Sequence, residues 1–153
     1  MRVPGIFWWP GTIEPGVVQE IGATTDLFTT IVPLAAGRVP DDRPLDGVDL
    51  SPVLFGTGPS PRDWMAYYRM GELYAYRRGP YKLHLVTEGR YGLGAERTEH
   101  DPPLLFHLGE DPGENHDLAA ERPDAVADLQ AAVDAHRSGM TAAEPLFDAR
   151  GPR

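Results

Sequence analysis

A short apolar run near the amino terminus places the strongest constraint on how this chain folds. Ile6 to Trp9 contains one isoleucine, one phenylalanine and two tryptophans, and a Pro-Gly pair stands on each side of it. Such a run predicts a short strand buried on both faces, as strands of covered parallel or mixed sheets are. A strand of this kind needs neighbouring strands, yet the chain continues into a turn. The alternative is a partly exposed edge strand, which leaves a large aromatic patch in water.

A helix is predicted after this strand. Residues 24–26, Thr-Thr-Asp, supply capping side chains, and Gly37 marks the end of the pattern. Between them the apolar residues follow helical spacing: Leu27, Phe28, Ile31, Val32, Leu34 and Ala35. We therefore expect a helix with one apolar face that lies on a core. An extended link rich in Pro and Asp follows, and residues 50–56 are predicted to form a short helical turn.

Strand patterns begin at residue 64. The aromatic-rich stretches 64–69 and 73–77 predict a hairpin. Residues 81–87 alternate, with Tyr81, Leu83 and Leu85 on one face and Lys82 and His84 on the other. This alternation predicts a half-buried third strand, and residues 104–108 predict a fourth.

A long polar loop over residues 88–101 is predicted between the third and fourth strands. After Pro123, apolar residues at helical spacing predict a helix with one apolar face: Val126, Leu129, Ala132, Val133 and His136. Four antiparallel strands covered by one helix make a stable α+β unit. We accordingly divide the chain into residues 1–62, residues 63–138 and a loosely ordered tail over residues 139–153.

Composition excludes several classes of function. The chain has 14 basic and 23 acidic residues and a net charge of -9, which argues against nucleic acid and against an anionic membrane surface as partners. No apolar run approaches the roughly 18 residues of a transmembrane helix. The absence of cysteine removes disulfides, thiolate metal sites and cysteine nucleophiles, and leaves the compartment open.

Motifs for catalysis are missing from the chain. No Gly-x-Ser-x-Gly elbow occurs, and the five histidines have neither the spacing of four on a helix nor a His-x-His pair. The acidic clusters at residues 41–49 and 111–117 lack the spacing of a calcium loop, and Asp beside Pro and Gly is typical of turns. We therefore predict no catalytic residue and no metal ligand in this chain.

One group of side chains remains as a candidate binding site. Its members are Lys82, His84, Arg77 and Arg78, which project from adjacent predicted strands and suit an anion-binding patch. The alternative is that Lys82 and His84 form the solvated face of a sheet. The loop over residues 88–101 is a further candidate, and it carries Arg90, Tyr91, Arg97 and His100. The alternative interpretation is that this loop is a solvated connection without a role in binding.

Several segments, in this order, resemble the later part of the arylsulfatases. These segments are Arg2–Gly11, Thr25–Thr30, Leu45–Leu54, Arg78–His84, Pro102–Leu108 and Asp111–Asn115. The resemblance to this formylglycine-dependent sulfatase family, which belongs to the alkaline-phosphatase-like superfamily, covers the chain from Arg2 to about His136. It implies an α/β fold in which residues 1–62 end a large catalytic domain and residues 63–138 form the small carboxyl-terminal subdomain.

The resemblance also implies a function. The family hydrolyses sulfate esters with a formylglycine nucleophile and a calcium ion, and both are expected in the complete enzyme rather than in this chain. The motif Cys or Ser, x-Pro-x-Arg has no match here, and Met1-Arg2 stands where the family has a Glu-Gly-Gly turn. We expect the carboxyl-terminal piece of a sulfuric ester hydrolase, inactive alone, which closes and shapes the substrate pocket. The candidates for its rim are Arg77, Lys82, His84 and His100.

The expected partners follow from this interpretation. They are the missing amino-terminal sulfatase domain and, in the complete enzyme, a sulfate ester, or else a second copy through self-association of the exposed amino-terminal strand. Two other functions stay open. One is a free-standing, non-catalytic structural or binding module, and the other is the end of a related phosphoesterase or phosphonate hydrolase.

Overall fold

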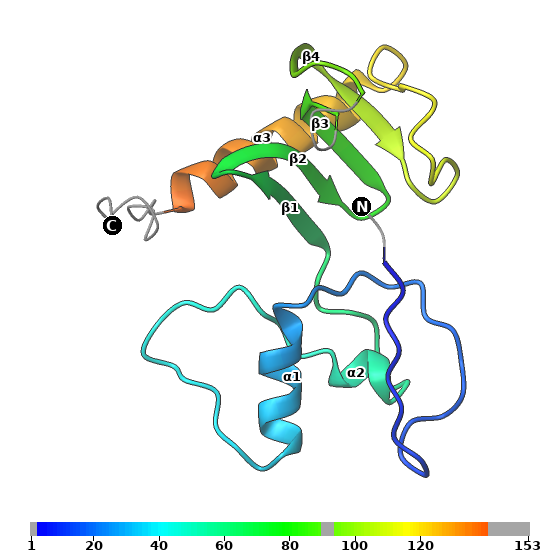
Figure 1. Cartoon of the computed structure of the whole chain (residues 1–153), viewed down its shortest axis with the longest axis vertical. Helices are drawn as coiled ribbons and strands as arrows, with labels where there is room; N and C mark the ends of the chain where they lie inside the picture. The colour runs from blue at the N-terminus through cyan, green and yellow to red at the C-terminus, as the bar shows by residue number, and fades with distance from the viewer. Residues whose placement is uncertain (1–2, 90–93, 141–153) are drawn as a thin grey trace. The chain divides into compact units, whose positions relative to one another are not determined.

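The computed structural model describes residues 3–89 and 94–140 of the chain. The chain separates into two compact units, Met1–Trp64 and Met65–Arg153. The first unit holds the helices α1 (Asp26–Leu34) and α2 (Ser51–Leu54), and the sheet and the third helix lie in the second (Figure 1). Among the described residues, no helix combines the length and the apolar character needed to cross a membrane. The predicted tail lies outside the described residues except for Gly139 and Met140.

The second unit is built on a sheet of four strands in the order β1-β2-β3-β4. The strands are β1 (Trp64–Arg69), β2 (Glu72–Arg78), β3 (Tyr81–Thr87) and β4 (Thr98–His107). Two-residue turns join the first three strands, and at the first turn both Met70 and Gly71 have positive φ, as tight hairpin turns require. The prediction of a four-stranded antiparallel sheet is confirmed.

Helix α3 (Pro123–Gly139) lies across one face of this sheet (Figure 1). Leu83 of β3 is paired with Leu105 of β4, and both side chains are fully buried, as is Val133 of α3. Apolar residues spaced at 3.6 on the helix and at 2 on the strands thus meet in one core. The predicted covering helix is confirmed, with Ala125, Leu129 and Val133 as its buried positions.

Strand β4 begins at Thr98, six residues before the predicted start, so the prediction of a loop over 88–101 is wrong for its last four residues. β4 is the outer strand of the sheet, where Pro102 and Pro103 are tolerated because no further strand needs their N–H groups. The register shifts between His84 and Val86. Beyond this bulge Val86 is the buried residue and Leu85 is only half-buried, so the predicted alternation stops at His84.

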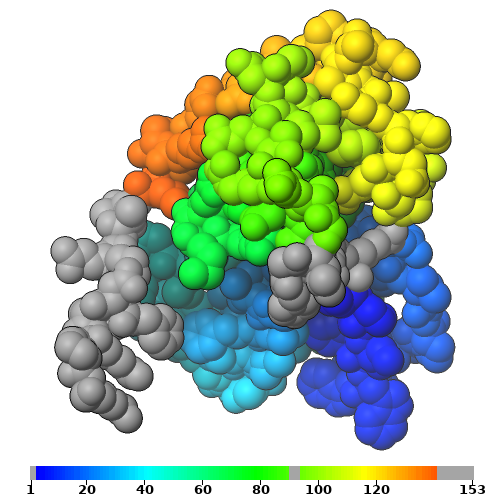
Figure 2. Space-filling view, turned by 45° about the horizontal axis from the view of Figure 1, so that its top comes forward, coloured from blue at the N-terminus to red at the C-terminus, as the bar shows by residue number. Residues whose placement is uncertain are grey.

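The segment that follows β4 lies beside it and protects its outer edge (Figures 1 and 2). The Asp117 carboxylate accepts the N–H of Leu105 at 2.9 Å, and the N–H of Leu118 donates to the Leu105 carbonyl at 2.8 Å. An unpaired strand edge is a template for association with other chains. Here part of that edge is already paired.

Helix α1 of the first unit is inverted relative to the prediction. Its buried residues are Asp26, Thr29 and Thr30, whereas its apolar residues are largely exposed: Leu27, Phe28, Ile31 and Leu34. The predicted spacing is present, but the apolar face does not lie on a core of the unit. The polar face is the one that the unit buries, because it anchors a network described below.

The segment with Ile6 to Trp9 is extended but pairs with no strand among the described residues. Ile6 is 90% exposed and Trp8 is 84% exposed, so the predicted burial on both faces is wrong for this structure. Phe7 and Trp9 are less exposed, and together with Trp8 they line an apolar groove with side chains of α1 and α2, among them Ile31, Leu34 and Leu54. The segment therefore lines this groove but leaves Ile6 and most of Trp8 open to solvent.

Candidate functional site

A cluster of ionisable side chains occupies the sheet face opposite α3. Lys82 and His84 project from β3 on the side away from Leu83, as predicted, and both contact Glu114. The Lys82 ammonium donates to Oε1 at 2.7 Å, and Nε2 of His84 lies 2.6 Å from Oε2. We call Tyr67, Lys82, His84 and Glu114 the Glu114 cluster.

Lys82 is a buried cation at the centre of this cluster. Its side chain is 5% exposed, so the alternative of a solvated sheet face is wrong for this residue. The ammonium also lies 4.7 Å from the centre of the Tyr67 ring, a cation–π distance. A buried charge is stable only when it is paired and hydrogen-bonded. Glu114 and the Tyr67 ring meet this requirement.

Glu114 is held in place by the turn that carries it. Its backbone has φ of 57°, an unusual conformation for a residue with a side chain. The Asp111 carboxylate secures the turn by accepting the N–H groups of Asn115 at 2.6 Å and His116 at 2.8 Å. The turn predicted from Asp, Pro and Gly at this place thus presents a carboxylate to the sheet.

The Glu114 carboxylate is a strong acid in this setting. The hydrogen bond from His84 lowers its pKa most; burial opposes this effect, and Lys82 adds to it, so the pKa falls to about 2. At neutral pH the carboxylate is therefore ionised and can only accept hydrogen bonds. Nε2 of His84 must then carry the hydrogen that lies between the two groups.

Arg77 lies next to the cluster. It is the register partner of Lys82 on the neighbouring strand, and its Nε donates to the Gly79 carbonyl at 2.9 Å. The guanidinium also bonds Tyr67, whose pKa is raised chiefly by burial. In residues 3–89 and 94–140 no carboxylate forms an ion pair with Arg77. The described part of this face thus combines Arg77, Lys82 and His84 with one carboxylate, Glu114.

His100, the fourth predicted rim residue, lies elsewhere on the sheet. Its Nε2 is 2.8 Å from Oγ1 of Thr87, and no contact joins it to the Glu114 cluster among the described residues. Arg97 of the same segment pairs with Glu72 and Glu99 at the surface. Arg90 and Tyr91 lie outside the described residues.

The sequence pattern missed two members of the cluster. Tyr67 was interpreted only as a strand-forming aromatic, and Glu114 only as part of a turn. Glu114 lies 32 residues from Lys82 and 30 from His84, and no local spacing links them. The only signal in the sequence was an acidic residue on a turn that follows the strands, together with two cationic residues on one strand face that need an acidic partner.

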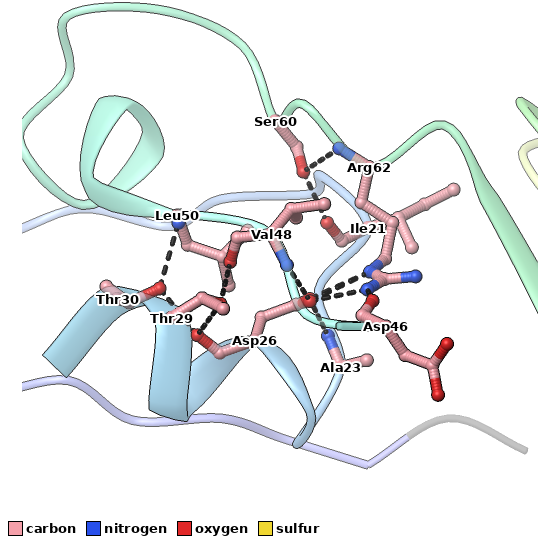
Figure 3. Close-up of polar contacts among 10 residues, drawn as sticks. All are labelled: Ile21, Ala23, Asp26, Thr29, Thr30, Asp46, Val48, Leu50, Ser60 and Arg62. Atoms are coloured by element: carbon pink, nitrogen blue, oxygen red, sulfur yellow. Dashed lines mark hydrogen bonds and ion pairs between the residues drawn. The ribbon is translucent and has the colours of Figure 1, made fainter. Parts of the chain in front are cut away.

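The first unit contains a second charged group, the ion pair of Asp26 and Arg62 (Figure 3). Both side chains are almost fully buried. The guanidinium donates through Nε and Nη2 to the two Asp26 oxygens, and Nη2 also reaches the Asp46 carbonyl at 2.5 Å. Bidentate Arg–carboxylate pairs of this kind are the strong and specific ones.

Asp26 joins three separate segments of the unit. Its carboxylate accepts the N–H of Ala23 at 2.7 Å and the N–H of Val48 at 2.9 Å, in addition to Arg62. Burial raises its pKa, but the hydrogen bonds from Arg62, Val48 and Ala23 outweigh burial and lower the pKa. Thr25 makes no capping bond through its side chain, so the predicted threonine cap is replaced by this arrangement.

Two threonines of α1 complete this network (Figure 3). Thr29 donates to the Val48 carbonyl at 2.6 Å, and Thr30 accepts the N–H of Leu50 at 2.9 Å. No described buried side-chain nitrogen or oxygen lacks a partner. Because the groups of this network are engaged with the protein itself, we interpret the network as structural and the Glu114 cluster as the candidate site.

No group of three or more His, Asp or Glu side chains is placed to hold a metal ion in the described parts of the chain. No step through a metal is derived for the described residues. Calcium and formylglycine stay predictions for the complete enzyme.

Comparison with known proteins identifies the family. Residues 60–151 match the family model for the C-terminal region of aryl-sulfatase, so this chain belongs to the sulfatase family. It is 41% identical to bovine (Bos taurus) arylsulfatase A over 77% of the chain and 26% of that protein. It is 35% identical to N-acetylgalactosamine-6-sulfatase of Sus scrofa over 99% of the chain and 33% of that protein. The chain thus spans about a third or less of these relatives.

A solved structure supports the fold. The crystal structure of the PsFucS1 sulfatase from Pseudoalteromonas sp. matches with a TM-score of 0.71 at 22% identity, over 86% of this chain and 28% of that one. The prediction of a C-terminal sulfatase region is confirmed by these findings. The individual site residues stay predictions.

Proposed function

We propose that this chain serves as the C-terminal portion of a sulfuric ester hydrolase, in which it closes and shapes the substrate pocket. In this proposal the nucleophile and the metal belong to the amino-terminal catalytic region of the complete enzyme. The relatives named above support a sulfate ester as the substrate class.

The inverted burial of α1 is the observation that carries the proposal. A helix that buries threonine and aspartate and exposes Phe28 and Ile31 presents its apolar face to something outside the described unit. The Ile6–Trp9 segment adds exposed aromatic side chains, and the backbone N–H and C=O groups of residues 3–8 form no backbone hydrogen bond among the described residues. An extended segment whose backbone groups are unpaired and whose apolar side chains are exposed suits the edge of another sheet.

A chimera tests this proposal. The C-terminal quarter of bovine arylsulfatase A is replaced by this chain, and turnover of para-nitrophenyl sulfate is measured. We expect activity in the chimera and none in the chain alone, with or without calcium. A matched chimera with Ile6→Asp and Trp8→Asp should lose activity, because a charge does not enter an apolar interface. Turnover by the pure chain alone would overturn the proposal, as would a folded but inactive first chimera.

The alternative partner, a second copy, predicts a different result. A free-standing module that associates through the exposed strand would form a stable dimer with its apolar surface covered. Sedimentation and binding of a hydrophobic dye separate the two possibilities. We expect the isolated chain to bind dye and to associate heterogeneously, and a well-defined dimer without dye binding would favour the module. Turnover of an aryl phosphate in place of the sulfate by the chimera would favour a phosphoesterase.

A further inference from the structure

We propose that Glu114 is the positioning residue of His84, and that it fixes the imidazole so that Nδ1 is presented to a hydroxyl group of the substrate. This inference rests on the proposed function, together with the prediction that His84 lies at the rim of the substrate pocket. It adds a residue, Glu114, that sequence patterns did not select, and it names the part of the substrate that His84 contacts.

The first step is the direction of the hydrogen bond. Glu114 is ionised and accepts hydrogen bonds only, so Nε2 of His84 donates across the 2.6 Å contact. In the neutral imidazole this leaves Nδ1 as the acceptor. In many proteins a carboxylate accepts a hydrogen bond from one ring nitrogen of a histidine. This bond sets the tautomer of the ring and the direction in which the other nitrogen points.

The second step is the availability of Nδ1. Nδ1 has no hydrogen-bond partner among the described residues. Every described side-chain nitrogen or oxygen that is fully buried does have a hydrogen-bond partner, so Nδ1 is not one of the fully buried atoms. Nδ1 is therefore accessible at the surface of the cluster. The ring itself cannot turn freely, because its edge meets the Phe106 ring at 5.4 Å between centres and 88° between planes.

The third step is the chemistry that this arrangement recognises. Lys82 already occupies the other oxygen of Glu114, so the carboxylate is held from two sides and His84 has one defined orientation. A neutral Nδ1 accepts a hydrogen bond from a hydroxyl group. The site thus suits a sulfate ester whose organic part carries hydroxyls, such as a sulfated monosaccharide. A simple aryl group has no hydroxyl that could donate a hydrogen bond to Nδ1.

A spectroscopic measurement on the chain itself tests the tautomer. Nitrogen-15 shifts of the His84 ring, recorded for its neutral form, should show hydrogen on Nε2 and a bare Nδ1. In Glu114→Gln the amide both donates and accepts, so we expect a mixture of tautomers. Glu110→Gln, an exposed change of the same charge four residues earlier, should leave the His84 shifts unchanged. Hydrogen on Nδ1 in the unaltered chain would overturn the proposal whether or not the variants fold.

Kinetics in the active chimera test the role. For a sulfated monosaccharide, Glu114→Gln and His84→Ala should each raise KM about tenfold, the usual effect of one lost hydrogen bond, and the double variant should be no worse than either. For para-nitrophenyl sulfate KM should stay unchanged. Equal increases of KM on both substrates would refute the positioning role. An inactive unaltered chimera would instead count against the proposed function. In that case the nitrogen-15 measurement of the His84 tautomer alone would test this inference.

Discussion

The two units of this chain are stabilised in opposite ways. The second unit packs apolar side chains of β3, β4 and α3 against one another and places its ionised cluster on the outer face of the sheet. The first unit buries an ion pair and two threonines and leaves most of its large apolar side chains exposed. A unit that exposes its apolar residues depends on a surface outside itself, whereas a unit with its own core does not.

The largest effect is expected at the ion pair of the first unit. Asp26→Ala leaves Arg62 buried without its partner and should cost about 3–5 kcal/mol of unfolding free energy. Hydrogen exchange should show that residues 3–64 lose protection while the strands β2 and β3 keep theirs. Asp42→Ala, which breaks an exposed pair with Arg43, should change nothing measurable. If β2 and β3 lose protection together with the first unit, the two units do not have independent stability.

A core truncation in the second unit should give the complementary result. Leu83 is fully buried against Leu105, so Leu83→Ala leaves a cavity and should cost about 2–5 kcal/mol. Ile31→Ala in α1 removes a similar volume at an exposed position and should be close to neutral in the isolated chain. Denaturant titration followed by Trp64 fluorescence and by exchange of β3 compares the two. A large cost at Ile31 would contradict the exposed apolar face of the first unit.

Acid should weaken the second unit through Glu114. Its pKa is about 2 in the folded chain against 4.5 for an unperturbed glutamate, so its contribution is complete above about pH 4.5 and is lost as the pH falls toward 2. We expect this contribution to be about 2 kcal/mol, after allowance for partial exposure.

The measurement for Glu114 is a set of urea titrations between pH 5 and pH 2, with exchange of β3 as the probe. Glu114→Gln should lower stability at pH 5 and flatten the dependence on pH in this range. Glu110→Gln serves as the control and should keep the dependence of the unaltered chain. An unchanged slope in Glu114→Gln would show that the cluster does not stabilise the fold.

The smallest effect is expected at Gly47. A Cβ at this position would lie 2.3 Å from the Thr25 carbonyl oxygen and 2.8 Å from Oγ1 of Thr29, which belongs to the network of Asp26. Gly47→Ala should therefore cost about 1–2 kcal/mol and loosen only the first unit. Gly16→Ala, in open space, is the matched control for thermal unfolding. Equal melting of the two variants would mean that the contact at Gly47 relaxes without cost.

Much of the second unit could be predicted from the sequence because its contacts are periodic. The strand 81–87 was predicted with both of its bounds and the last helix with its start at Pro123, since alternation and helical spacing were both present. The start of β4 was missed because of Pro102 and Pro103. Proline cannot donate a backbone hydrogen bond, so it argues against a strand unless that strand is known to lie at the edge of the sheet. The Glu114 cluster was found only in part, because a turn residue gives no sign of the sheet face that it contacts.

The sequence by itself determined most of the helices and strands, the family and the presence of cations on one face of the third strand, because spacing along the chain records local structure. Only the tertiary structure decided which face of α1 is buried and which carboxylate Lys82 and His84 contact. The physical reason is that burial and ion pairing depend on segments far apart in the sequence, such as Asp26 and Arg62, which are separated by 36 residues. The apolar spacing of α1 was read correctly, but spacing alone does not say whether the surface that it contacts belongs to the same unit.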